Sequence, residues 1–239
     1  MGNPDARLVA ERDDLLHDPR AYATPPPVAP HNQIVFGVRC FGSLLPKPVE
    51  DSVGLRQNTE HMKWRNLDVG AGYYYITGTF VEWLPLLRRE EVRAVVCAEI
   101  ARALARCQAS VTAFVLMPDH LHLIVYLPRE GILHGFNRHW RGRSARRTID
   151  ALQQQGDWQT LDVLARHANG ECRYAVWKEQ VRCLPVVTDE KLLSLVEYVH
   201  GNPVRRGLAD SADEWPFSSF RFYERGERVS LDVAPPLVA

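Results

Sequence analysis

Two histidines one residue apart are the first side chains in this sequence whose type and spacing could do chemistry. They are His120 and His122, in the stretch MPDHLHLIVYLP that runs from Met117 to Pro128. Side chains alternate between the two faces of an extended strand, so both imidazoles should point to the same side. Such a pair is a common way to present two metal ligands, but a metal site needs at least a third. The alternative is that both rings lie on the open surface of a half-buried sheet.

A tyrosine and an asparagine nearer the C-terminus form a second pair. Tyr198 and Asn202 are four residues apart, so on a helix they would lie one turn from each other on the same face. A phenol and an amide oxygen presented together could serve as a nucleophile and as the third metal ligand. The alternative is that the tyrosine only packs at the end of its helix.

A local cluster of positive charge is the third feature. The stretch RHWRGRSARR, which starts at Arg138, has no acidic residue until Asp150, although the chain as a whole has a formal net charge of +0. The planar fork of arginine suits bidentate phosphate contacts and stacking on bases. The alternative is a solvated helix face.

Seven predicted elements must position these residues. Strands are expected at 72–81, 110–117, 120–128 and 172–183, and helices at 88–107, 131–155 and 188–203. We expect the second helix to break or kink near Gly142 and a polar segment to follow it as far as Glu171. Thr188 should cap the last helix, and Pro203 should end it, because proline disfavours helical geometry in the residue before it.

The resulting order is βαββαβ followed by a helix. It predicts an α+β fold of the ferredoxin-like split βαβ type, with an antiparallel sheet, helices packed on one face, and a C-terminal helix that carries the tyrosine. We expect residues 1–66 to be a proline-containing N-terminal extension with a possible strand at 33–41. Residues 67–225 should be the main domain and 226–239 a C-terminal tail.

Cysteine usage and hydropathy bear on the compartment. The five cysteines are widely spaced and include no C-x-x-C pair, so neither a disulfide framework nor a zinc ribbon is predicted. No apolar run approaches the ~20 residues that a membrane-spanning helix needs, and the N-terminal residues lack a signal-peptide core. We therefore expect a cytoplasmic protein in a reducing compartment, with no membrane partner.

Three blocks of the sequence together resemble the REP-associated tyrosine transposases, which belong to the single-tyrosine HUH group. The blocks are MPDHLHLIVYLP, EYVHGNPVRRGL and EWPFSSF, and the resemblance covers roughly residues 72–222. The name HUH denotes a histidine, a hydrophobic residue and a histidine, which are His120, Leu121 and His122 here. The nucleophilic tyrosine of the family stands four residues before the asparagine of an NPV segment. That place is held by Tyr198, and the polar residue that can complete the metal site is Asn202.

The resemblance implies a metal-dependent single-stranded DNA endonuclease and strand transferase that acts through a 5′-phosphotyrosine intermediate. A phenol has an unperturbed pKa of about 10 and is a poor nucleophile at neutral pH, so a cation beside the scissile phosphate would help. The implied cofactor is Mg²⁺ or Mn²⁺, and the implied substrate is palindromic DNA folded as a hairpin. The resemblance favours a monomer over a dimer.

A DNA substrate gives the basic cluster a possible role as a backbone clamp and stacking platform. The candidate DNA contacts are Arg138, Trp140, Arg141, Arg143, Arg146, Arg147, Arg205 and Arg206. For His139 and Trp140, the alternative is a place in the core. Asp119 is close enough to support the histidines, but it is expected simply to make the turn before them.

Two other functions stay open at the level of the sequence. One is a DNA-binding protein of transposase ancestry that recognises hairpins without cutting them. The other is a zinc hydrolase, which would need another His, Asp or Glu beside the histidine pair.

The sequence also departs from the family in three places. They are its N-terminal ~65 residues, the long segment 153–171, and Gly201, where a bulkier residue is expected before the asparagine.

Overall fold

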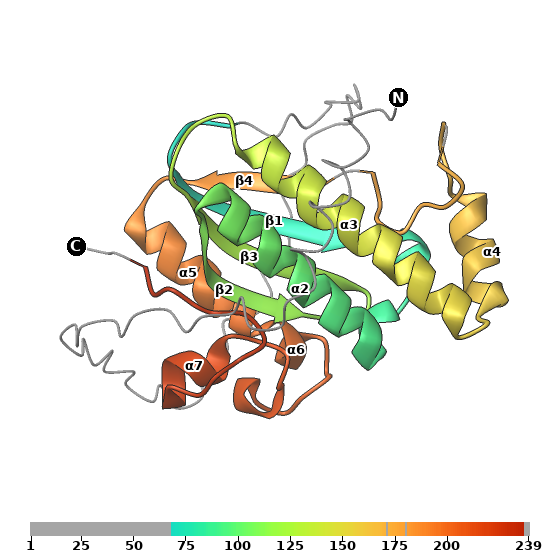
Figure 1. Ribbon diagram of the computed structural model, residues 1–239. Helices are drawn as coiled ribbons and strands as arrows, with labels where there is room; N and C mark the ends of the chain where they lie inside the picture. Colours follow the sequence, from blue (N-terminus) through green and yellow to red (C-terminus); the bar gives the residue numbers. More distant parts are fainter. Residues whose placement is uncertain (1–67, 171, 180, 237–239) are drawn as a thin grey trace, which may run out of the picture. The chain divides into compact units, whose positions relative to one another are not determined.

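The described part of the chain is built on a four-stranded antiparallel sheet (Figure 1). The computed structural model describes residues 68–170, 172–179 and 181–236, so the predicted extension at 1–66 and the possible strand at 33–41 lie outside the described residues. The strands are β1 (Gly72–Thr79), β2 (Ser110–Leu116), β3 (His120–Leu127) and β4 (Arg182–Val186). Their order across the sheet is β2-β3-β1-β4, and every neighbouring pair is antiparallel.

Helices occupy the long connections between these strands. The helices are α2 (Glu90–Cys107), α3 (Leu133–Gln154), α4 (Trp158–Arg166), α5 (Asp189–His200), α6 (Asn202–Arg205) and α7 (Phe220–Arg225). Helix α2 joins β1 to β2, α3 and α4 lie between β3 and β4, and the others follow β4. This order confirms the predicted α+β fold of the ferredoxin-like split βαβ type. None of the helices formed by the described residues is long and apolar enough to cross a membrane.

Both faces of the sheet are covered by helices. Figure 1 shows α2 and α3 side by side across one face, where Ile76 of β1 and Leu123 of β3 belong to the main core. On the other face, Tyr75 and Ile124 pack with Val199 of α5 in a second core. The expectation that helices pack on one face therefore holds for α2 and α3, whereas α5 lies on the opposite face. Because side chains alternate along a strand, His120, His122 and Ile124 of β3 point toward α5, on the face opposite Leu121 and Leu123.

The fourth strand begins later than predicted. It was expected at 172–183, but β4 is Arg182–Val186, and Trp177 makes only an isolated bridge to Phe80. The physical reason is that the Trp177 ring stacks on Phe80 in the core, with ring centroids 4.1 Å apart. Pro185 is tolerated in β4 because this strand is at the edge of the sheet and pairs only with β1.

Helix α4 lies in the segment that was expected to be a polar connection. Asp157 caps it, since its carboxylate accepts a hydrogen bond from the Thr160 N–H at 3.0 Å. Leu161 and Leu164 are buried against the core, and their i, i+3 spacing after an aspartate is the signal that could have predicted the helix. Helix α3 also differs from its prediction, because it continues through Gly142 without interruption.

The predicted C-terminal tail is part of the folded domain. Leu231 is 3% exposed, and Val233 forms a parallel bridge with Val111 of β2. The Ala234 N–H donates to the Val111 carbonyl at 2.9 Å. Strand β2 is at the edge of the sheet, so this segment covers backbone groups that would otherwise be unpaired. The domain therefore extends beyond residue 225.

Candidate active site

The two imidazoles lie together on the face of the sheet that α5 covers. In the register between β1 and β3, His120 is opposite Thr79 and His122 is opposite Thr77. The two ring centroids are 4.9 Å apart, with an interplanar angle of 83°. The two histidines are 5% and 6% exposed. They therefore share one face as predicted, and the alternative of an open surface is wrong.

Each imidazole is held through its Nδ1 atom by an oxygen. His120 Nδ1 lies 2.5 Å from the Asp119 carboxylate, and His122 Nδ1 lies 2.7 Å from the Tyr75 hydroxyl and 3.2 Å from the Thr77 hydroxyl. Histidines that bind a metal through Nε2 typically donate the Nδ1 proton to such an oxygen, which fixes the tautomer and the ring orientation. Within the described part of the chain, these contacts leave both Nε2 atoms available. Asp119 therefore does more than make the turn.

The surroundings of the histidines favour the neutral imidazole. Burial lowers the pKa of His120, although the hydrogen bond and charge of Asp119 work in the opposite direction. Burial also lowers the pKa of His122 to about 3, and the charges of Arg205 and Arg206 add to the effect. A neutral imidazole is the form that binds a metal ion.

Tyr198 approaches the histidines from α5. The α5 cap forms as predicted, since the Thr188 hydroxyl accepts from the Lys191 N–H at 3.2 Å. The Tyr198 ring centroid lies 6.0 Å from that of His122, and Tyr198 is 44% exposed. The guanidinium of Arg205 lies 4.3 Å from the centre of the ring. An accessible phenol thus stands beside the imidazole pair with a cation over its ring.

Asn202 lies at the junction of α5 and α6. Its side-chain amide nitrogen donates to the carbonyls of Tyr198 at 2.9 Å and Val199 at 3.4 Å. These bonds use the nitrogen and leave the amide oxygen for another partner. Pro203 follows in the first turn of α6, where its missing N–H costs nothing. Helix α5 therefore ends before the proline, as predicted.

The third block of the resemblance fastens α5 to the sheet. The Ser219 hydroxyl accepts from the Phe114 N–H of β2 at 2.9 Å and lies 2.7 Å from Nε2 of His200. The indole of Trp215 donates to the Leu116 carbonyl at 3.1 Å. Residues of this block thus link the end of the tyrosine helix to β2.

The donor atoms of His120, His122 and Asn202 are of types that bind divalent cations. If the three side chains bound one cation, positions would remain for phosphate oxygens and water, which Mg²⁺ and Mn²⁺ accept. Among the residues that the structure describes, no group of three His, Cys, Asp or Glu could hold a metal ion. The zinc-hydrolase alternative therefore lacks its third ligand in that part of the chain.

Comparisons with known proteins agree with the resemblance. No protein-family model matches the chain. A Haemophilus influenzae protein named "Putative REP-associated tyrosine transposase" is 23% identical over 111 residues, which are 45% of this chain and 57% of that protein. A solved structure of a REP-associated tyrosine transposase bound to a REP hairpin aligns with a TM-score of 0.50 and 20% identity, over 74% of this chain and 93% of that one. The resemblance is confirmed in sequence and in fold.

Two departures from the REP-associated tyrosine transposases now have structural explanations. The long segment after residue 153 contains α4. A Cβ atom at Gly201 would lie 2.6 Å from a guanidinium nitrogen of Arg205, whose other terminal nitrogen donates to the Tyr198 carbonyl. A bulkier residue at 201 would push this guanidinium away from the tyrosine.

Three arginines lie close to the imidazoles and Tyr198. The charges of Arg205 and Arg206 act on His122, so both arginines lie near the imidazole pair. Arg182 is opposite Thr77 in the β1–β4 register, so it shares the face of His122. Arg182 is not among the residues predicted from the sequence, because the face on which it lies depends on the pairing of β4 with β1.

Trp140 is not available as a stacking platform for DNA. It is 0% exposed, its indole donates to the Asn137 side chain at 3.1 Å, and its ring packs against Trp177 at 5.1 Å. A Cβ atom at Gly78 would lie 2.7 Å from the Trp140 ring, so the sheet itself leaves space for the indole. The alternative of a core position is correct.

The other arginines of the basic cluster belong to α3, on the face of the sheet opposite the histidines. Arg143 and Arg147 bind the Glu99 carboxylate of α2 at 3.0 and 2.9 Å. Arg146 pairs with Asp150 at 3.3 Å, Arg141 donates to the Lys178 carbonyl, and Arg138 is exposed. The structure therefore does not bring this cluster together with Tyr198 and the histidines, and much of its charge is used within the protein.

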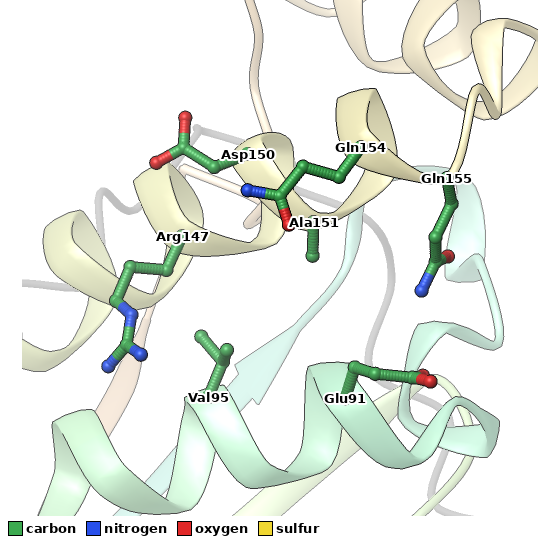
Figure 2. Close-up of a pocket in the computed structure, with 7 residues that line it drawn as sticks. All are labelled: Glu91, Val95, Arg147, Asp150, Ala151, Gln154 and Gln155. Carbon is green, nitrogen blue, oxygen red and sulfur yellow. The ribbon is translucent and has the colours of Figure 1, made fainter.

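An open pocket of about 360 Å³ lies between α2 and α3 on this same face, and Figure 2 shows the residues that line it. Arg147, Asp150 and Gln154 of α3 face Glu91 and Val95 of α2 across it. None of the proposed catalytic residues lines this pocket. It is therefore separate from the candidate active site.

Glu99 stabilises the contact between α2 and α3. Its side chain is 0% exposed and also binds Arg102 at 2.5 Å. Burial alone would raise the pKa of Glu99, but hydrogen bonds from Arg147 and Arg143 and the charge of Arg102 lower it. The carboxylate therefore stays ionised in the folded protein.

We expect Glu99→Gln to lower the free energy of unfolding by about 2 kcal/mol at pH 7, because three charge-assisted hydrogen bonds become weaker. A lowered folded-state pKa gives a stabilisation that is present above the unfolded pKa of about 4.3 and is lost as pH falls through the folded-state value. The free energy of unfolding, measured with urea, should thus differ less between wild type and variant below about pH 4. The exposed Glu91→Gln on the same helix is the control and should cost less than about 1 kcal/mol. A difference that does not vary with pH would contradict the assignment.

If the two imidazoles hold a divalent cation, Asp119→Asn should weaken its binding by about 10- to 100-fold, because an amide orients and polarises the His120 ring less than a carboxylate does. Titration with Mn²⁺ followed by electron paramagnetic resonance measures this directly. Asp213→Asn, at a partly exposed position whose carboxylate pairs with Arg225 of α7, serves as the control. Equal Mn²⁺ affinity in wild type and Asp119→Asn would show that this carboxylate has no part in the site.

Proposed function

We propose that this protein is a metal-dependent endonuclease and strand transferase for single-stranded DNA, with Tyr198 as its nucleophile. The observation that carries the proposal is the exposed Tyr198 phenol beside two imidazoles whose Nδ1 atoms are both held by oxygens. His120, His122 and Asn202 are the proposed metal ligands. Bound Mg²⁺ or Mn²⁺ would supply Lewis-acid polarisation of the phosphate and a template for the reacting groups.

The proposed reaction conserves the phosphodiester bond. The Tyr198 hydroxyl loses its proton to solvent, and its oxygen attacks phosphorus in line with the leaving group. A bond forms between the tyrosine oxygen and phosphorus, and the bond from phosphorus to O3′ breaks. O3′ takes up a proton and leaves as a 3′-hydroxyl, so the other DNA end stays linked as a 5′-phosphotyrosine. Attack by a second 3′-hydroxyl reverses these steps, joins the strands and restores the phenol.

The arginines of this face support the chemistry electrostatically. Arg205 lies over the Tyr198 ring, so its charge favours the negative charge that develops on the phenol oxygen during attack. Arg206 and Arg182 are the proposed contacts for neighbouring phosphates. In this proposal these three residues replace the α3 arginines as the DNA contacts nearest the reacting atoms.

The proposed substrate is a single strand that carries a hairpin. The proposal draws on the related structure, which is described as bound to a REP hairpin. Tyr198 and His122 of the same chain lie side by side, so one chain can assemble the reacting groups, and we propose that a monomer is sufficient. The remaining alternative is a protein that binds hairpins without cutting them.

The polarity of the covalent product tests the proposal. We expect Mn²⁺ and a hairpin-bearing single strand to give a protein–DNA adduct that survives a denaturing gel and carries a label from the 3′ end of the DNA. A label at the 5′ end should leave with a fragment that ends in a 3′-hydroxyl. Mass spectrometry should find the adduct on the peptide that contains Tyr198. Tight binding with no adduct would favour the non-catalytic alternative, and a protein-linked 5′ label would contradict the reaction.

A further inference from the structure

An exposed tryptophan lies next to His120, outside the residues used in the proposed reaction. Trp83 is 52% exposed, and its ring centroid lies 6.1 Å from that of His120. The ammonium of Lys178 lies over the indole, 4.0 Å from its centre. An indole in this position keeps a large apolar surface in water, so its place beside the histidines needs a physical reason.

The backbone that carries Trp83 has an uncommon conformation. Glu82 and Trp83 have φ angles of 51° and 53°, and the Leu84 N–H donates to the Val81 carbonyl at 3.1 Å. These residues form a tight turn whose two central residues are both left-handed. Asn-Gly is the usual sequence for such a turn, because large side chains are strained there. The chain instead places a tryptophan at this position.

Backbone bonds fix this turn relative to the histidines. The Phe80 N–H donates to the Asp119 carbonyl at 3.1 Å, and the Lys178 N–H donates to the Thr79 carbonyl at 2.8 Å. The first bond ties the turn to the residue that holds the His120 ring, and the second ties Lys178 to the end of β1. Strained backbone persists only where its surroundings determine it in this way, and it clusters at functional sites.

We propose that Trp83 is a stacking platform for a nucleobase of the DNA strand, beside the phosphate that Tyr198 attacks. The proposal rests on the proposed function and names a binding site within it. Single-stranded DNA binds proteins by stacking bases on exposed aromatic rings between cationic groups, and Lys178 supplies such a group here. Because Trp83 and His120 are neighbours, the stacked base and the attacked phosphate would belong to the same nucleotide or to adjacent ones.

Arg141 acts on this platform from the other side of the sheet. Its guanidinium donates to the Lys178 carbonyl, next to Trp177, which is packed in the core. Arg141 thus helps to hold the segment that bears Lys178.

The affinity of cleavage-inactive protein for DNA tests the platform. We would measure fluorescence anisotropy of a labelled hairpin-bearing oligonucleotide with an unpaired flank, in the Tyr198→Phe background. Trp83→Ala should weaken binding by about 5- to 150-fold, the range that follows from the loss of one stacked base. Trp83→Tyr should restore most of the affinity, because it keeps an aromatic face. Trp158→Ala is the matched control, since Trp158 is 62% exposed on α4 and should leave the affinity unchanged.

Single abasic substitutions along the unpaired flank separate stacking from a general effect on folding. An abasic site at one position should lower the DNA affinity of the protein that retains Trp83. The same abasic site should hardly change the DNA affinity of Trp83→Ala, because both changes remove the same contact. Losses that are equal in both proteins at every position would overturn the proposal. Trp83→Gly gives a second readout, because glycine relieves the left-handed backbone. We expect Trp83→Gly to weaken DNA binding without lowering the melting temperature, whereas a lower melting temperature with unchanged affinity would overturn the proposal.

These results are distinguishable from a failure of the proposed function. If wild type forms the Tyr198 adduct but Trp83→Ala binds DNA normally, the platform is wrong and the function stands. If wild type forms no adduct but DNA binding depends on Trp83, the platform stands and the catalytic proposal is wrong.

Discussion

Replacing Tyr198 by phenylalanine is expected to abolish the covalent protein–DNA adduct and to leave hairpin affinity nearly unchanged. The substitution removes one hydroxyl group from a side chain that is 44% exposed, and no bond to phosphorus can form without that oxygen. The ring that contacts His122 and Arg205 is retained. The adduct should be measured on a denaturing gel with DNA labelled at its 3′ end, and the affinity by anisotropy.

Tyr75→Phe is the matched control for this prediction. Tyr75 lies on the same face, its ring stacks on His122 at 5.5 Å, and burial raises its pKa to about 12. Its hydroxyl orients an imidazole and stays protonated, so we expect Tyr75→Phe to slow cleavage by about 10- to 100-fold and still form the adduct. An adduct that persists in Tyr198→Phe and disappears in Tyr75→Phe would show that the wrong tyrosine has been assigned.

The site residues that could be predicted from the sequence are those whose spacing alone determines which face of a strand or helix their side chains share. A period of two places His120 and His122 on one face of β3, and a helical turn relates Tyr198 to Asn202. The residues that hold the histidines were less predictable. Tyr75 meets His122 only through the pairing of β1 with β3, which are far apart in the chain and not joined by a tight turn.

The basic cluster shows what periodicity leaves undetermined. The pattern of α3 indicates which residues share a side of the helix, but not which face of the sheet the helix will cover. Because α3 packs with α2, Trp140 lies in the main core. For the same reason Arg143 and Arg147 form ion pairs with Glu99. The exposed Trp83 of the proposed platform could not be predicted either. It lies in a tight turn from Val81 to Leu84, where hydrophobic periodicity carries no information.

His122→Ala is expected to reduce the rate of single-turnover cleavage in Mn²⁺ by on the order of 10³-fold, because charge stabilisation by a bound cation contributes several kcal/mol to the transition state. The affinity for Mn²⁺ should fall as well, which electron paramagnetic resonance can measure without DNA. Chelation of the metal should slow the wild type to a similar rate and have little further effect on the variant. His134→Ala, exposed on α3, is the control. A variant that keeps both Mn²⁺ affinity and cleavage would remove His122 from the proposed site.

The same variant tests whether one chain holds the whole site. His122→Ala retains the nucleophile, and Tyr198→Phe retains the proposed ligands, so a mixture of the two contains every reacting group. If Tyr198 and His122 of one chain act together, as proposed from their 6.0 Å ring separation, the mixture should cleave no faster than the sum of the rates of the two variants measured separately. Restored cleavage would require exchange of α5 between two chains, and would replace the proposed monomer by a dimer with shared sites.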